Sequence, residues 1–182
     1  IAGMSIVTRI SFFTYAMVIG LGQGFQPLCG FCYGAKLYGR VKEAFFFCIK
    51  CGTVFLSVCA LLGFIFSTSI ISIFRDDAAV VAVGSVALRW QVLSFPLVAS
   101  IVLTNMLMQT IRKPVRANIV AAARSGLFFI PLIFILPYFF GLLGVEMCQM
   151  WADCCSFAVA VPIAWSAFRD MRREKMELGK SH

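Results

Sequence analysis

One carboxylate lies well inside a stretch of this sequence that is otherwise free of charge. Asp153 interrupts the apolar run 147–168, and Arg9 lies at a comparable expected depth in the first apolar stretch. A charged side chain inside a membrane costs at least ~2.5–3.5 kcal/mol, so it needs a partner or a role in transport. We therefore expect either that Asp153 and Arg9 pair or that Asp153 takes up a proton or a coupling cation. A purely structural ion pair, or a residue of the outer vestibule that reaches water, is the alternative.

Amide side chains occur at the end of the same first stretch. The segment Gly20-Leu-Gly-Gln-Gly-Phe-Gln-Pro27 places Gln23 and Gln26 where lipid offers them no partner. Arg9, Ala16 and Gln23 are seven residues apart and so share one helical face. These side chains predict either a water-filled pathway or a helix–helix contact, because amides and small residues also join membrane helices.

Two later stretches carry polar stripes at helical spacing. The first stripe consists of Gln91, Ser94, Val98, Ile101, Asn105 and Gln109, and the second of Gln149, Asp153, Ser156 and Ala160. Such stripes favour a water-accessible pathway for a substrate or an ion. The pathway residues that we predict are Arg9, Gln23, Gln26, Asn105, Gln109, Gln149 and Asp153.

Two cysteine pairs have a spacing that some zinc sites use. Cys29 and Cys32, followed by Cys48 and Cys51, spell C-x2-C-x15-C-x2-C. The second pair, however, lies in an apolar helical run, where cysteine serves as a small hydrophobic residue. We therefore expect no metal site.

No constellation of catalytic residues stands out. The one histidine is His182, and neither a G-x-S-x-G nucleophile motif nor a phosphate-binding loop occurs. With Asp153 as the one carboxylate well inside an apolar stretch, general acid–base chemistry lacks its participants. We expect neither enzymatic activity nor an organic cofactor.

The elements that position these residues are predicted to be membrane-spanning helices. Of 182 residues, 61% are hydrophobic and 13% are charged, against about a quarter charged in a typical soluble domain. Uncharged runs cover 10–35, 51–74, 90–111 and 125–145. Because about 20 apolar residues span a bilayer, we predict an all-α polytopic membrane protein with five spans. Their expected bounds are 4–32, 44–66, 79–111, 117–138 and 145–168, followed by a basic tail over 169–182.

The net charge of +8 is interpreted as a topology signal. Basic residues fill every second connection: Lys36, Arg40 and Lys42, then Arg112, Lys113, Arg116 and Arg124, and finally Arg169, Arg172, Arg173, Lys175 and Lys180. Such connections face the cytoplasm in multi-pass proteins. We predict a multi-pass protein of the cell membrane with a cytoplasmic C-terminus. Nucleic-acid binding, the other common reason for a basic chain, is not expected.

Local signals mark where the spans begin and end. We expect a loop at 36–43, a short amphipathic segment at 67–74, and a long third element opened by Arg75-Asp-Asp-Ala78. Lys113-Pro114 stops that element, and a tight turn at 141–144 joins the last two spans. The chain opens at Ile1 without a cleavable leader, and many helical transporters are built from paired repeats. We expect an internal or C-terminal piece of a longer protein.

Three motifs resemble the C-terminal lobe of the multidrug and toxic compound extrusion (MATE) transporters. They are Gly20-x-Gly-Gln-Gly-x-Gln-Pro27, Gly34-Ala35-x4-Arg40-Val41 and Gly144-x4-Gln149-x2-Ala152-Asp153. The resemblance covers essentially the whole chain, in the right order. It implies a twelve-helix protein of two six-helix lobes, in which this chain supplies the eighth to twelfth helices and the N-terminal lobe is missing.

The resemblance also implies an activity for the whole protein. Family members export cationic and amphipathic compounds in exchange for sodium ions or protons, by alternating between inward- and outward-open states. The implied partners are drug-like small molecules, the lipid bilayer and the missing N-terminal lobe. The chain departs from the family pattern in having Met150 where Pro is frequent, and no Asp or Glu before Glu43. It is therefore closer to branches whose coupling acid lies in the N-terminal lobe.

Two other functions stay open at this point. Lipid-linked oligosaccharide flippases of the same superfamily would need several cationic residues in the cavity to hold pyrophosphate. Arg9 is the main candidate here, which favours small-molecule export. A non-transporting membrane subunit would suit a chain of five helices.

Overall fold

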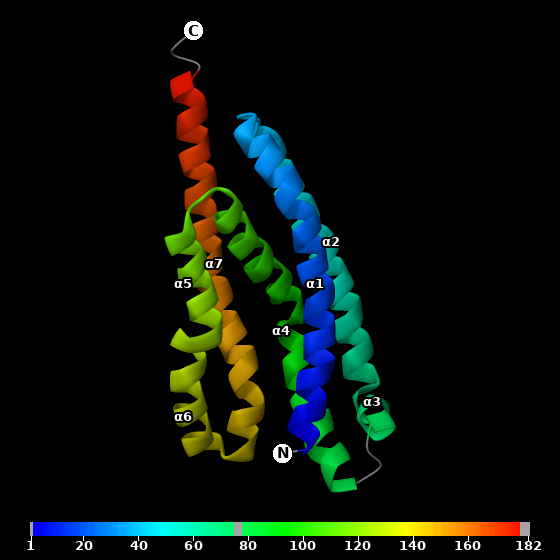
Figure 1. Ribbon diagram of the computed structural model, residues 1–182. Coiled ribbons are helices and arrows are strands. Elements are labelled where there is room, and N and C mark those ends of the chain that lie inside the picture. Colours follow the sequence, from blue (N-terminus) through cyan, green and yellow to red (C-terminus); the bar gives the residue numbers. More distant parts are fainter. Residues whose placement is uncertain (1, 75–77, 179–182) are drawn as a thin grey trace.

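The computed structural model describes residues 2–74 and 78–178, and these form helices without a strand. The elements are α1 (Ala2–Gly34), α2 (Tyr38–Ile65), α3 (Ser67–Phe74), α4 (Ala78–Thr110), α5 (Pro114–Ala122), the π-helix η1 (Ala123–Leu127), α6 (Phe129–Phe140) and α7 (Leu142–Leu178). Figure 1 shows them as a bundle with α3 and the start of α1 at one end and the last turns of α7 at the other. The end at which α7 finishes is called the basic end below.

Five helical stretches are long and apolar enough to cross a membrane, which confirms the predicted fold class. They are Ser5–Gly34, Tyr38–Ile65, Ala78–Thr110, Pro114–Phe140 and Met147–Leu178. A 33-residue helix such as α4 is about 50 Å long at 1.5 Å per residue, which exceeds a hydrocarbon core of about 30 Å. Turns at the ends of the longest helices therefore extend into the polar interface.

The helices run further at the basic end than we expected. α2 begins at Tyr38 rather than near residue 44, so the loop shrinks from 36–43 to the three residues after Gly34. α7 continues to Leu178, so most of the expected tail 169–182 is helical. Charged residues are compatible with a helix once it has left the lipid. The expected opening of α4 at 75–77 lies outside the described residues.

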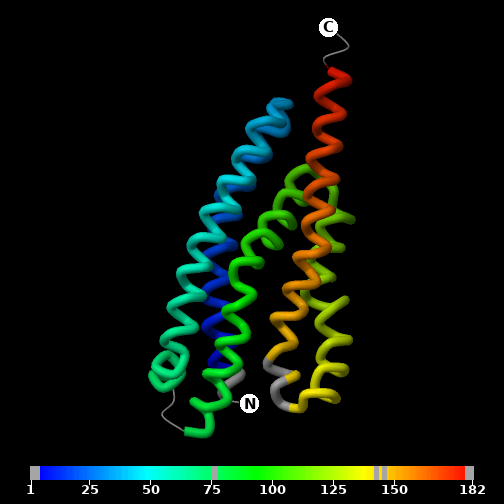
Figure 2. The backbone as a smooth tube through the Cα atoms, turned by 180° about the vertical axis from the view of Figure 1, so that it is seen from behind, coloured from blue at the N-terminus to red at the C-terminus, as the bar shows by residue number. Residues whose placement is uncertain are grey.

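Helix α4 is the centre of the bundle. It packs against α1, α2 and α7, and Figure 2 shows it between the α1–α2 pair and the α6–α7 pair. One core cluster joins α4 to α1 and α2 around Leu56, Leu88 and Phe95. A second, nearer the basic end, adds α7 and includes Phe25, Phe45 and Leu107. This arrangement leaves α4 with apolar contacts on most sides.

Small residues let α2 and α4 approach closely. A Cβ at Gly52 would lie 3.1 Å from the Ala99 Cβ, and one at Gly63 would lie 2.9 Å from a Val92 methyl. Close backbone approach of this kind is a common way to pack helices in lipid, where the hydrophobic effect gives no preference for helix–helix contact.

Helix α6 differs from α4 in having no buried residue. Four of its five aromatic side chains are exposed, namely Phe134, Tyr138, Phe139 and Phe140. An apolar face of this kind suits contact with lipid. Gly141, with a φ of 59°, turns the chain from α6 into α7, and a Cβ at Gly144 would lie 2.3 Å from the Leu136 carbonyl oxygen. The glycines thus allow the two helices to lie against each other immediately after a short turn.

Candidate functional site

A buried ion pair joins the π-helix η1 to α7. The Nε–H of Arg124 donates to Oδ1 of Asp153 at 3.1 Å. The Asp153 side chain has no exposed surface, whereas 22% of the Arg124 side chain is exposed. The carboxylate also accepts hydrogen bonds from Gln149 Nε2 at 3.2 Å and from Ser94 Oγ at 2.8 Å. A buried charge is tolerable when it is both paired and hydrogen-bonded, and Asp153 meets both conditions.

The local sequence explains how these four side chains meet. Gln149 and Asp153 lie one turn apart on α7, and Ser94 comes from the facing surface of α4. Arg124 comes from η1, where the backbone N–H of Phe128 bonds to the Ala123 carbonyl at 3.2 Å, five residues back. A π-segment inserts extra chain into a helix and so redirects the side chains around it, and such segments are frequent at functional sites.

An aromatic residue of α1 completes the cluster. The Arg124 guanidinium lies over the Tyr15 ring, 4.5 Å from its centroid. Gln91 Nε2 of α4 donates to the Tyr15 hydroxyl at 2.9 Å. The Tyr15 ring also meets Phe95 edge-on, with centroids 6.0 Å apart. Side chains of α1, α4, η1 and α7 therefore hold Arg124 in place.

A cavity of about 500 Å³ adjoins this cluster. Its lining consists of Val7, Thr8, Ser11, Phe12, Tyr15, Ala87, Gln91, Arg124, Ser125, Phe129, Ile133 and Gln149. Its volume is in the range of ordinary small-molecule sites. Mostly apolar walls with a few polar groups are also typical of such sites. We refer to it as the Arg124 cavity. Ser11 is 6% exposed, and its hydroxyl has no hydrogen-bond partner among the described residues.

The sequence led us to the wrong partner for Asp153. A pair with Arg9 was one of two expectations, but Asp153 pairs with Arg124. Arg9 is exposed and lines a separate, mainly apolar hollow with Phe12 and Phe13. In the sequence, Arg124 follows the loop charges Arg112, Lys113 and Arg116 and is expected to belong with them. Its position inside the expected span 117–138 was the available signal that it belonged with Asp153.

Other predicted pathway residues lie apart from the cluster. Asn105 donates to the Ala117 carbonyl at 2.9 Å and so joins α4 to α5 near the basic end, while Gln109 donates to Asn105 within α4. Gln23 is exposed on α1 and Gln26 is half-buried there. A Cβ at Gly20 or Gly24 would meet no atom within 4 Å. This face of α1 therefore has no close helix partner in the described part of the chain.

The four cysteines of the C-x2-C-x15-C-x2-C spacing differ in their surroundings. Cys29, Cys32 and Cys48 belong to the apolar core cluster near the basic end, and Cys51 is exposed. Within the described residues, no three His, Cys, Asp or Glu side chains come together as a metal site would require. The three buried cysteines pack among apolar side chains, as free cysteines do when they serve as small hydrophobic residues.

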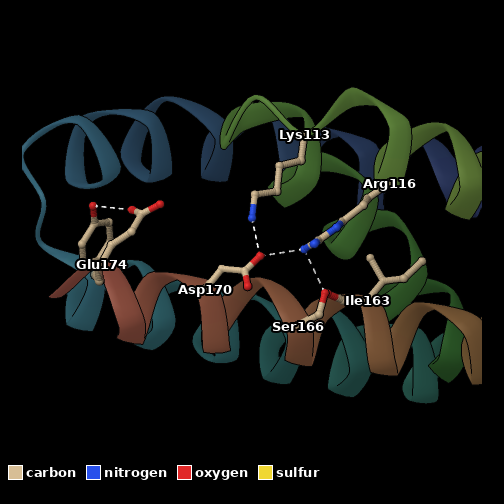
Figure 3. Close-up of polar contacts among 7 residues, drawn as sticks. Lys113, Arg116, Ile163, Ser166, Asp170 and Glu174 are labelled. Atoms are coloured by element: carbon tan, nitrogen blue, oxygen red, sulfur yellow. Dashed lines mark hydrogen bonds and ion pairs between the residues drawn. The ribbon is translucent and has the colours of Figure 1, made fainter. Parts of the chain in front are cut away.

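A second acidic centre lies at the basic end of α7. Asp170 accepts hydrogen bonds from Lys113 and from Arg116, the latter at 3.0 Å, and Arg116 also donates to Ser166 at 3.0 Å. One helical turn further on, Glu174 accepts a hydrogen bond from the Tyr38 hydroxyl at 2.8 Å. Figure 3 shows how these contacts link the α4–α5 turn and the start of α2 to α7.

The fold and the site together define a helical membrane lobe built around a buried ion pair and an adjoining cavity. The MatE family model matches residues 1–135 of this chain. Because that match covers well over half of the residues, the chain belongs to the MatE family, which confirms the resemblance to MATE transporters.

Individual relatives agree with this assignment. The multidrug export protein MepA of Staphylococcus saprophyticus is 26% identical over 179 residues, covering 98% of this chain and 39% of that protein. MepA of Staphylococcus aureus is 29% identical over 166 residues, covering 91% of this chain and 36% of that protein. The chain therefore spans 36% to 39% of the length of the curated relatives it matches.

Solved structures match the arrangement of the helices. The Vibrio cholerae MATE transporter VcmN in its bent form superposes with a TM-score of 0.87 at 18% identity, covering 93% of this chain and 39% of that one. The MATE multidrug transporter DinF-BH has a TM-score of 0.81 at 31% identity, covering 90% of this chain and 36% of that one. At 18% identity, the likeness to VcmN concerns the fold alone. At 31% identity, the likeness to DinF-BH extends to the sequence.

Proposed function

We propose that the protein to which this chain belongs is a multidrug exporter, a secondary antiporter that exchanges drug-like molecules for sodium ions or protons. The observation that carries the proposal is membership of the MatE family over residues 1–135, together with relatives named as multidrug export proteins. The expected substrates are cationic or amphipathic small molecules. The chain would supply the C-terminal lobe, and the lobe that precedes it in the same protein would supply the other wall of the pathway.

The Arg124 cavity supports a role in transport rather than in anchoring alone. It combines aromatic and aliphatic walls with Arg124, Gln91 and Gln149, as sites for amphipathic ligands do. A membrane protein tolerates such polar groups only where protein or water satisfies them. We therefore propose that this cavity forms part of the substrate pathway, and that Arg9, Gln23, Gln26, Asn105 and Gln109 contribute to it when the whole protein is assembled.

Dye efflux from intact cells tests the exporter proposal. The full-length protein is expressed in cells that lack their main efflux pumps, and the loss of preloaded ethidium is followed by fluorescence. We expect faster efflux than with the empty vector. Dissipating the sodium gradient and the proton gradient separately identifies the coupling ion, because only the one in use should slow the export. Equal efflux with and without the protein would overturn the proposal.

Asp153 is the residue that we propose for coupling in this lobe. Its carboxylate is paired with Arg124, so an incoming proton or sodium ion would compete with the guanidinium for it. Asp153→Asn keeps the shape and removes the charge. We expect export by this variant to lose its dependence on the driving ion gradient. Unchanged coupling would make Asp153 part of a structural ion pair and leave coupling to the N-terminal lobe.

Two alternatives make different predictions. A flippase for lipid-linked sugars would need several cationic groups to hold pyrophosphate, yet Arg124 is the one charged side chain among the described residues that line the Arg124 cavity. A non-transporting subunit would leave dye efflux unchanged. We also propose that the basic end faces the cytoplasm of the cell membrane, which an accessibility assay on a tag placed after residue 182 would test.

A further inference from the structure

Only the positive partner of the Arg124–Asp153 ion pair borders the Arg124 cavity. Asp153 has no exposed surface and is absent from the cavity lining, whereas its partner Arg124 belongs to that lining. Arg124 is the one charged side chain among the described lining residues. The carboxylate neutralises the pair as a whole, but a molecule inside the cavity contacts the guanidinium and not the carboxylate.

Several side chains at this wall can donate hydrogen bonds. A guanidinium has five N–H donors, and the contact with Asp153 uses the Nε–H. Because the pair and the Tyr15 ring fix the position of Arg124, the guanidinium presents a preorganised edge to the cavity. Ser11 adds a buried hydroxyl that has no partner among the described residues. The amide of Gln149, which donates to Asp153, stands beside them.

We infer that the Arg124 cavity binds amphipathic molecules by an anionic or strongly hydrogen-bond-accepting group, a carboxylate being the best match. An arginine fork recognises carboxylates through two parallel hydrogen bonds, and the aromatic residues Phe12, Tyr15 and Phe129 provide surfaces for a ring system. A ligand with a positive charge at this point would be repelled by the guanidinium of Arg124. The inference rests on the proposed export function for its biological role, but it concerns binding, which can be measured separately.

Rhodamine B and its ethyl ester form a matched pair of probes. Both carry the same cationic ring system, and only the first has a free carboxylate. Binding of each dye to the purified full-length protein in detergent is measured by fluorescence anisotropy. We expect the carboxylate dye to bind about tenfold more tightly, the gain typical of one hydrogen bond to a charged group. Equal binding, or tighter binding of the ester, would overturn the inference.

Variants then assign the preference to this cavity. Removing Arg124 alone would leave Asp153 buried without a partner, so the test is the double variant Arg124→Gln/Asp153→Asn, which removes both charges. We expect the preference for the carboxylate to disappear in it. The matched control is Arg89→Gln, because Arg89 lies on α4 but contacts Ser67 and Phe64 instead. A preference that survives in the double variant would place the carboxylate elsewhere and overturn the inference.

Ser11→Ala provides a second measurement should the double variant fail to fold. It deletes one oxygen that makes no hydrogen bond to a described residue, so its fold should be kept. We expect the preference to fall severalfold, and Ser57→Ala on the exposed side of α2 to leave it unchanged. An unaltered preference in Ser11→Ala would contradict the cavity assignment. If the dyes bind as expected but ethidium efflux is equal with and without the protein, the exporter proposal fails and the binding inference stands.

Discussion

Two arginine–aspartate pairs join the same two stretches of the molecule. Arg124 and Asp153 connect η1 to the first half of α7 at 3.1 Å, and Arg116 and Asp170 connect α5 to its second half at 3.0 Å. The distances are nearly equal, but the surroundings are not. The Asp153 side chain is wholly buried, whereas 32% of the Asp170 side chain and 37% of the Arg116 side chain are exposed.

The difference decides what each pair can do. Around Asp170 water competes for every charge, and a second cation, Lys113, stands ready if Arg116 is lost. Around Asp153 no water-exposed surface is available, and Arg124 is the cation that compensates the carboxylate. An exposed pair contributes about 0–1 kcal/mol, while the loss of one partner from a buried pair costs several times more because the other charge stays behind. Burial, not distance, gives the inner pair its importance.

Arg124→Ala is expected to have the largest effect on stability. We expect it to destabilise the folded protein by about 3–5 kcal/mol, because the carboxylate of Asp153 would remain buried without its cation. The measurement is thermal unfolding of the purified full-length protein in detergent, together with the yield of folded protein. Arg116→Ala is the matched control and should cost about 1 kcal/mol or less. Similar losses for the two variants would show that the inner carboxylate finds water or another cation.

Hydropathy is enough to predict the five spans and to single out Asp153, since both depend only on the types of residues in a window of sequence. The partner of Asp153 depends on how helices are rotated, which such a window does not contain. Arg9 is exposed because α1 presents its other faces, with Ser11 and Thr14, to the bundle. Arg124 reaches Asp153 from a π-segment, and one extra residue in a helix rotates the following side chains by about 100°. No signal of spacing in the sequence marks that segment.

Tyr15→Leu tests how much the Tyr15 side chain contributes to holding Arg124. It removes the ring on which the guanidinium stacks and the hydroxyl that accepts from Gln91. We expect a loss of about 1–2 kcal/mol, from one partly buried cation–π contact and one hydrogen bond. Tyr15→Phe keeps the ring and should cost about 1 kcal/mol or less. Thermal unfolding measures both, and equal losses in the two variants would assign the whole effect to the hydroxyl.

The polar stripe of α4 shows where a periodic pattern stops being informative. Ser94 faces the Asp153 carboxylate, as a pathway residue should, but further along the stripe Asn105 bonds to α5 and Gln109 bonds to Asn105. The stripe also includes Val98 and Ile101, which are simply buried. A shared helical face tells which side chains lie on one side of α4. It does not tell which neighbouring helix covers each part of that side, and the neighbour determines the role.

Asp170→Asn is expected to have the smallest effect, and its dependence on salt is the more informative measurement. At low ionic strength we expect a loss of about 1 kcal/mol or less, because Lys113 and Arg116 lose a partner but remain partly hydrated. The loss should shrink further as salt is added, since the Debye length falls from about 30 Å at 0.01 M to about 3 Å at 1 M. Unfolding of Asp153→Asn over the same salt series is the control, because a buried pair is screened much less. If both variants lose their effect in salt to the same degree, water reaches the inner pair, and the contrast between the two ends of α7 would have to come from geometry rather than burial.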